Sequence, residues 1–92
     1  SVKTVGEIQQ HHRDRNSEIL KVLQGKHMTA YEISSLLTWS TGGISWERLN
    51  DFTKRSAVLE TISHLELLFT KDILQKSNQD GVYKYSIIRW VL

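Results

Sequence analysis

The spacing of apolar residues changes once along the chain. Up to about residue 70, apolar residues recur every three or four positions, which is the period of amphipathic helices. We predict three helices from this pattern, near residues 6–24, 29–38 and 50–70. After Lys71, two short apolar stretches near 72–76 and 82–88 flank a polar segment that is rich in turn-forming residues. This second pattern predicts a β-hairpin.

Local signals mark where the predicted helices begin. Thr29 and Glu32 have the T-x-x-E spacing of a capping box, in which each side chain binds a backbone amide at the start of the helix. Asn50 or Asp51 can cap the third helix in the same position. The apolar residues that we expect to face the core are Ile8, Ile19, Leu20, Val22 and Leu23, then Ala30, Ile33, Leu36 and Leu37, then Val58, Leu59, Ile62, Leu65, Leu68 and Phe69.

Three helices followed by a hairpin is the element order of a winged helix-turn-helix. Asp80-Gly81 supplies the positive backbone dihedral angles that a hairpin turn needs, and the turn is expected within 77–81. We therefore predict an α+β fold, mainly helical, with three helices and a C-terminal β-hairpin wing. No internal linker or repeat is present, so residues 1–92 are expected to form a single domain.

Composition narrows the class of protein without naming an activity. The chain has 92 residues, no cysteine and a formal net charge of +2. The absence of cysteine excludes disulfides and thiolate chemistry, and it favours a cytoplasmic location. No apolar run approaches the length of a membrane span, so no membrane partner is expected.

The third predicted helix has the wrong charge for a DNA-reading helix. Lys54 and Arg55 are opposed there by Asp51, Glu60 and Glu66, whereas duplex binding depends on cationic contacts to phosphate. We therefore expect no nucleic-acid partner. If the chain is instead a DNA-binding regulator, the residues expected to contact DNA are Thr53, Lys54, Ser56 and Lys84.

No set of residues predicts a catalytic or metal site. The histidines are His11, His12, His27 and His64, and adjacent His11 and His12 diverge by about 100° on a helix. Glu60 and His64 are four residues apart, which favours an ion pair or a half-buried histidine over a metal site. No catalytic residue, metal ligand or cofactor is therefore assigned to this chain.

Two further features have alternative interpretations. Trp39 and Trp46 flank a glycine-containing loop, and closure of a small core over that loop is favoured over a ligand slot. On the first helix, the apolar stripe continues from Ile19 back to Arg15 and His12, and thus becomes polar. That stripe is typical either of a helix docked on another protein surface or of a solvated extension.

Three segments together resemble a known domain. They are "HRDRNSEIL" at 12–20, "TAYEI" at 29–33 and "RSAVLETISHLELL" at 55–68. In this order they resemble the C-terminal winged-helix domain of bacterial metallo-β-lactamase-fold hydrolases. The matching positions are His12, Arg13 and Arg15, then Thr29, Ala30, Tyr31, Glu32 and Ile33, then Ala57, Glu60, His64, Leu65 and Leu68. Arg15 lies one residue earlier than the family spacing, and Lys71-Asp72 stands where the family commonly has a glycine turn.

The resemblance implies an accessory role. The chain would buttress a preceding catalytic domain of the same polypeptide and border its substrate entrance, with residues 1–24 including the connecting helix. His12, Arg13 and Arg15 are the candidates for domain docking or for the substrate entrance. Zinc or another divalent metal would be held by an H-x-H-x-D-H motif in that preceding domain, and the substrate class stays open. The alternatives are a free-standing DNA-binding transcriptional regulator and, as a partner, a second copy of the chain in a homodimer.

Overall fold

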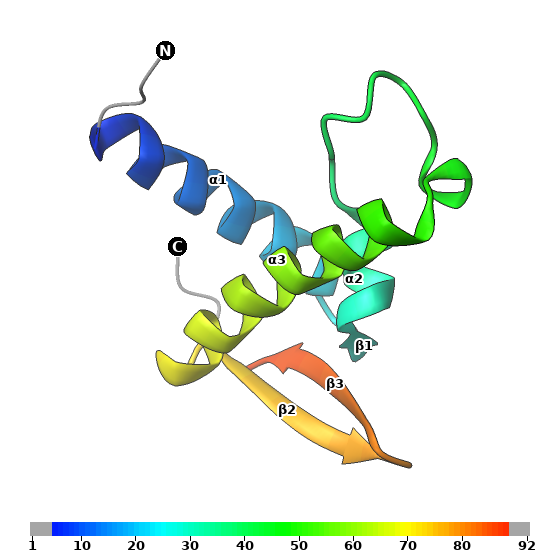
Figure 1. The fold of residues 1–92 in the computed structure, drawn as a ribbon. Coiled ribbons are helices and arrows are strands. Elements are labelled where there is room, and N and C mark those ends of the chain that lie inside the picture. Colours follow the sequence, from blue (N-terminus) through cyan, green and yellow to red (C-terminus); the bar gives the residue numbers. More distant parts are fainter. Residues whose placement is uncertain (1–4, 89–92) are drawn as a thin grey trace.

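A computed structural model of the chain describes the backbone of residues 5–88 and the side chains of residues 14–88. The elements are α1 (Val5–Leu23), β1 (Met28–Thr29), α2 (Ala30–Leu36), the short 3₁₀ helix η1 (Trp46–Arg48), α3 (Asp51–Thr70), β2 (Leu74–Gln79) and β3 (Val82–Ile87). The predicted α+β class is confirmed, with three helices that precede a hairpin along the chain (Figure 1). No helix within residues 5–88 has the length and apolar character needed to cross a membrane.

The strands form one antiparallel sheet in the order β1-β3-β2. Strand β1 was not predicted, because two residues are too few to leave a pattern in the sequence. Thr29 ends this strand and also caps α2, and both hydrogen bonds of its capping box with Glu32 are present. The arrangement is compatible with a winged helix whose wing is the β2–β3 hairpin.

The hairpin turn is tighter than predicted. Gln79 pairs with Val82, so Asp80 and Gly81 alone make the turn, with φ of 55° and 84°. Two successive residues with positive φ are typical of a type I′ turn, which matches the twist of the flanking strands. Asn78 belongs to β2, and its side chain accepts a hydrogen bond from the Gly81 amide. The expected turn at 77–81 was therefore too long.

The end of α3 explains how the chain does without a glycine at Lys71-Asp72. Asp72 has φ of 60°, and its amide donates to the Phe69 carbonyl. The Ile73 amide donates to the Leu68 carbonyl at 3.1 Å, which completes a Schellman motif. Aspartate tolerates this left-handed conformation better than most residues. The turn thus keeps its geometry with an aspartate in place of glycine.

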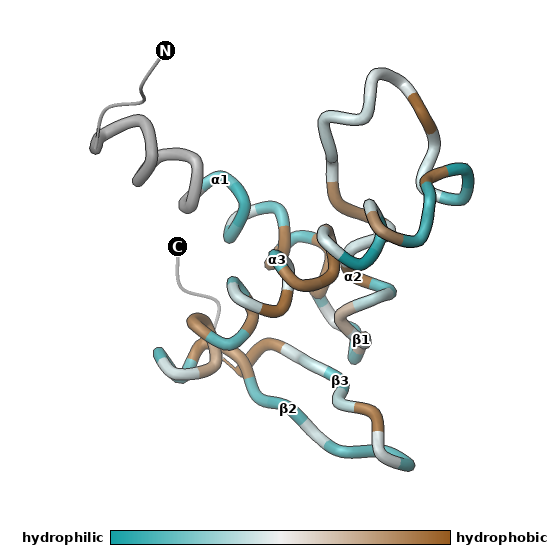
Figure 2. Tube along the Cα trace, viewed as in Figure 1, coloured by the Kyte–Doolittle hydropathy of each residue, from teal (hydrophilic) through white to brown (hydrophobic). Residues whose placement is uncertain are grey.

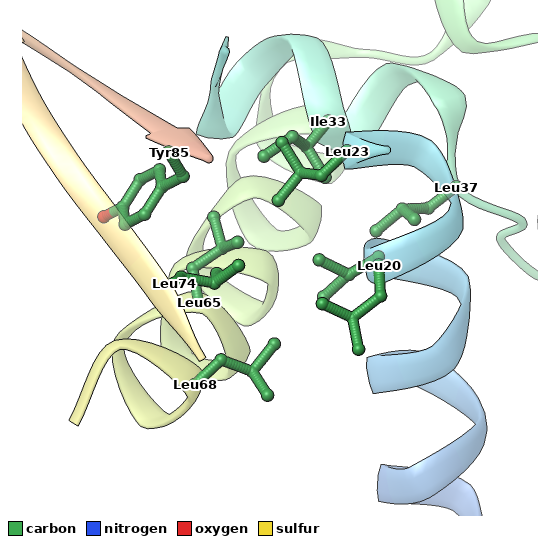
Figure 3. Close-up of a cluster of buried hydrophobic side chains, with 9 residues drawn as sticks. Leu20, Leu23, Ile33, Leu37, Leu65, Leu68, Leu74 and Tyr85 are labelled. Carbon is green, nitrogen blue, oxygen red and sulfur yellow. The ribbon is translucent and has the colours of Figure 1, made fainter. Parts of the chain in front are cut away.

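The core lies where all three helices meet the sheet. Figure 3 shows Leu20 and Leu23 of α1 facing Leu65 and Leu68 of α3, with Tyr85 contributed by β3. The trace changes from hydrophilic to hydrophobic along α1 as that helix approaches α3 (Figure 2). The predicted inward positions Ile19, Ile33, Leu37, Leu65 and Leu68 are all buried, while Ile8 lies outside the residues whose side chains are described.

The buried face of α3 is rotated relative to the prediction. Leu59 is 60% exposed, whereas Thr61 and His64 are buried. The Thr61 hydroxyl donates to the Ala57 carbonyl, and His64 Nδ1 lies 2.9 Å from Asn16 Oδ1. Polar groups with such partners can be buried at little cost. The stripe defined by apolar residues alone was therefore right at Leu65 and Leu68 and wrong at Leu59, and it omitted the buried polar positions.

Helix α2 shows the same effect on a smaller scale. Leu36 was predicted to face the core, but it is exposed. Ser34 is buried instead, and its hydroxyl donates to the Ala30 carbonyl at 2.7 Å. A serine that binds the preceding turn in this way can replace an apolar residue inside a helix face.

Candidate functional site

Arg15 is enclosed by its own chain. Its side chain is 10% exposed, and Nη1 donates to the Glu18 carboxylate at 3.0 Å and to the Thr38 carbonyl at 2.9 Å. The guanidinium lies 4.2 Å from the centre of the Trp39 ring. Arg15 therefore attaches the loop 37–50 to α1. Its contact with a neighbouring domain stays a prediction, and His12 and Arg13 lie outside the residues whose side chains are described.

Trp39 lies near one end of the loop 37–50 and Trp46 near the other, and each contacts α2. Trp39 Nε1 donates to the Ser34 carbonyl at 2.8 Å, and its ring packs against the core. Trp46 meets Tyr31 edge-on, with ring centroids 5.6 Å apart. Both tryptophans also line a cavity of about 140 Å³ beneath the loop. The loop is thus fixed to α2 at two points.

A larger pocket opens between α1, the loop 37–50 and α3. It has a volume of about 360 Å³, and we call it the α1–α3 pocket. Its wall is formed by Arg15, Trp39, Ser40, Thr41, Leu49, Thr53, Ser56, Ala57 and Glu60. The four residues from α3 follow the spacing i, i+3, i+4, i+7, so they form one stripe of that helix.

The α1–α3 pocket contains charges of both signs. Arg15 Nε lies 3.7 Å from Glu60 Oε2, which is too long for a hydrogen bond. This Nε atom is buried and has no hydrogen-bond partner. Glu60 is 47% exposed and belongs to the accessible part of the wall. The pocket therefore combines an enclosed cation with a carboxylate that water can reach.

A second surface lies on another side of α3. Its N-terminal half carries Phe52, which is 78% exposed, together with Leu59. Tyr31 of α2 is half exposed, and it lines a pocket of about 330 Å³ together with Asp51, Lys54, Arg55, Val58 and Leu59. We call Tyr31, Phe52, Arg55 and Leu59 the α3 apolar face. In a DNA-binding winged helix, this half of the third helix enters the major groove.

The residues considered for DNA contact lie in three places. Thr53 and Ser56 line the α1–α3 pocket, whereas Lys54 lines the pocket beside Tyr31. Lys84 lies on β3 opposite Thr29. The loop 37–50 projects beside the start of α3, where a helix-turn-helix has a short turn (Figure 1).

Lys84 lies close to the capping box of α2. The pKa of Glu32 is below its usual value, first because its carboxylate accepts the backbone amide of Thr29. The positive charge of Lys84 adds to this effect. Lys84, one of the residues considered for DNA contact, is thus already close to the Glu32 carboxylate of its own chain.

The wing is fastened to α3 by a cluster that the sequence analysis missed. The Glu66 carboxylate accepts hydrogen bonds from Lys76 Nζ at 3.0 Å and from the Tyr85 hydroxyl at 2.8 Å. These hydrogen bonds hold the pKa of Glu66 below its usual value, and the bond from Tyr85 has the larger effect. Burial, followed by the bond to Glu66, raises the pKa of Tyr85. Lys76 pairs directly with Tyr85 across the hairpin, a register that follows only from a two-residue turn at Asp80-Gly81.

No group of three or more potential metal ligands occurs among the described residues. His64 is 5% exposed and faces Asn16, and Glu60 points toward Arg15. This part of the chain thus brings together no ligand set for zinc. It gives no information on a preceding domain.

Comparison with known proteins assigns no family. No protein-family model matches the chain, and no curated protein matches it significantly. The resemblance to the winged-helix domain of metallo-β-lactamase-fold hydrolases therefore rests on the three motifs in the sequence.

Proposed function

We propose that this chain is an accessory winged-helix domain of a metallo-β-lactamase-fold hydrolase. In this role it docks on the preceding catalytic domain and borders the substrate entrance, and it takes no part in the chemistry. The motifs behind the proposal lie in the winged-helix elements: "HRDRNSEIL" in α1, "TAYEI" across β1 and α2, and "RSAVLETISHLELL" in α3. The observation that carries a docking role is the α3 apolar face.

The composition of the α3 apolar face favours a protein partner over DNA. Base edges are read by arginine, lysine, asparagine and glutamine, which present hydrogen-bonding groups to the groove. Here Phe52 and Leu59 are among the exposed positions, and an inserted phenylalanine would leave base edges without partners. Aromatic residues together with arginine are enriched at protein interfaces, and exposed apolar clusters mark such sites. Tyr31, Phe52 and Arg55 have this composition.

The proposal divides the residues of α1 between two roles. Arg15 is enclosed and holds the loop 37–50 in place, so it supports the docking surface from inside. His12 and Arg13 are the candidates for the substrate entrance, where a guanidinium suits an anionic group. The divalent metal would belong to the catalytic domain, and the enzyme would be cytoplasmic. Its substrate stays open, because fold does not fix function.

The test uses the full-length polypeptide, with serine substituted for one of two exposed leucines of α3. The proposal predicts an H-x-H-x-D-H motif upstream of Ser1. In that polypeptide, Leu59→Ser should lower kcat/KM or weaken docking of the two domains, while bound metal is unchanged. Leu67→Ser is the matched control, because Leu67 is an exposed leucine on the C-terminal half of the same helix. An upstream sequence without the motif would refute the family, and equal behaviour of the two variants would refute the docking face.

The competing function is a free-standing transcriptional regulator. It would be supported by nanomolar binding of duplex DNA at physiological salt that is lost in Lys54→Ala. The Phe52→Ser variant separates the two functions when both DNA binding and domain docking are measured. If α3 reads DNA, the variant should bind DNA equally well or better, because no apolar side chain then enters the groove. If α3 docks on a protein, the variant should lose its protein partner.

A further inference from the structure

The α1–α3 pocket is negative at its opening, although it contains an arginine. Arg15 is opposed by two carboxylates, Glu18 at 3.0 Å and Glu60 at 3.7 Å. The arginine side chain is 10% exposed, whereas that of Glu60 is 47% exposed. An incoming group therefore meets the carboxylate before the guanidinium. This order of charges opposes the binding of a carboxylate or phosphate at Arg15, since two negative charges already surround that cation.

Hydrogen-bonding capacity in the α1–α3 pocket points the same way. Arg15 Nη1 already donates to Glu18 and to the Thr38 carbonyl. Glu60 lies beyond hydrogen-bond distance of Arg15 Nε, so its oxygens can accept from another donor. Thr53 and Ser56 place hydroxyl groups on the same stripe of α3, two turns and one turn before Glu60, respectively. The accessible wall thus offers acceptors to a ligand that brings both donors and a positive charge.

We propose that the α1–α3 pocket binds an organic cation, namely the guanidinium or ammonium group of a basic side chain. Glu60 supplies the opposite charge, Thr53 and Ser56 accept hydrogen bonds, and Leu49 and Ala57 contact the aliphatic stem. A guanidinium is preferred over an ammonium, because its planar fork presents several donors to acceptors spread along one helix. The volume of about 360 Å³ lies within the range of small-ligand sites.

The source of that cation rests on the proposed function: it is a basic side chain of the docked catalytic domain. Arg15 then acts as a positioning residue. It holds Trp39 and the loop 37–50 as one wall of the pocket, while Glu60 on α3 forms the other. The same helix would thus present an apolar face and an acidic pocket to its partner.

The test is a titration of the 92-residue chain with N-acetyl-argininamide, followed by amide NMR. Saturable shifts are expected at residues 53, 56 and 60 and at the Trp39 indole, with a Kd of about 1–10 mM for a single side chain. N-acetyl-lysinamide should bind more weakly, and uncharged N-acetyl-norleucinamide should give no localised shift. Glu60→Gln should weaken binding about three- to tenfold, because a half-exposed ion pair contributes about 1 kcal/mol. Glu47→Gln removes an exposed carboxylate outside the pocket and should have no effect.

Three results would overturn the site. The first is that N-acetyl-glutamate amide shifts the same residues and the arginine probe does not. The second is that the norleucine probe binds as tightly as the arginine probe. The third is that Glu60→Gln, with a native spectrum, binds the arginine probe with unchanged affinity. The titration needs no catalytic domain, so its failure is separate from failure of the proposed function. If the probe binds but Glu60→Gln leaves domain docking unchanged, the site stands and its assignment to the docked domain is wrong.

Discussion

Replacing Arg15 with alanine should destabilise the chain by about 3 kcal/mol. The bond from Nη1 to the Thr38 carbonyl is charge-assisted; such bonds contribute about 1.5–3 kcal/mol, and this one is at the low end because it is exposed. The Glu18 carboxylate is 29% exposed, so solvent screening limits that ion pair to about 0.5–1 kcal/mol. Stacking of the enclosed guanidinium on Trp39 adds about 1 kcal/mol. In a domain of this size, a loss of 3 kcal/mol lowers Tm by about 12–24 °C.

Urea unfolding followed by circular dichroism measures this loss directly. Arg15→Lys should be intermediate, because an ammonium cannot donate to Glu18 and Thr38 while stacking on Trp39 in the same way. Arg55→Ala is the control, since Arg55 is an exposed arginine, and it should change stability by less than about 0.5 kcal/mol. If Arg15→Ala unfolds at the same urea concentration as the parent chain, Arg15 does not anchor the loop 37–50.

Three other predictions concern the turn, the wing and nucleic acid. Asp72→Gly should raise stability by about 0.5–1 kcal/mol, because glycine adopts a φ of 60° at lower cost than aspartate, and an unchanged or lower urea midpoint would contradict this difference. The pKa of Glu66 is depressed, so the stability it contributes is fully present above pH 4.5 and is lost as the pH falls through the folded-state pKa. Glu66→Gln should therefore flatten the acid side of the stability curve; a variant that loses stability in acid as steeply as the parent would count against the wing cluster. In fluorescence anisotropy at physiological salt, a DNA duplex should bind only weakly, and a nanomolar affinity that depends on Lys54 would show that α3 reads DNA.

Element types could be predicted from the sequence because each has a strong local cause. The capping box at Thr29 and the Asp80-Gly81 turn act over a few residues, and the change of apolar period acts over whole helices. Strand β1 could not be predicted, since its two residues are defined only by pairing with β3. The rotation of α3 was missed because Thr61 binds its own helix, which a hydrophobic pattern does not record.

The candidate sites were less predictable than the fold. Arg15 could be singled out as a polar residue on an apolar stripe, but the sequence did not show that Trp39, Glu18 and Glu60 would surround it. Glu18 is only three residues from Arg15, but the contacts with Trp39 and Glu60 join positions far apart in the chain. The exposed Leu59 was assigned to the core for the same reason, since burial depends on which face the neighbouring elements cover.

Hydrogen–deuterium exchange tests the central claim, that this domain docks through the N-terminal half of α3. The comparison is between the isolated 92-residue chain and the same residues within the proposed full-length hydrolase. Docking predicts slower exchange at residues 51–60 and 30–33 in the longer protein, while the exposed turn at 79–82 exchanges equally in both. Identical exchange at 51–60 in the two proteins would contradict the account.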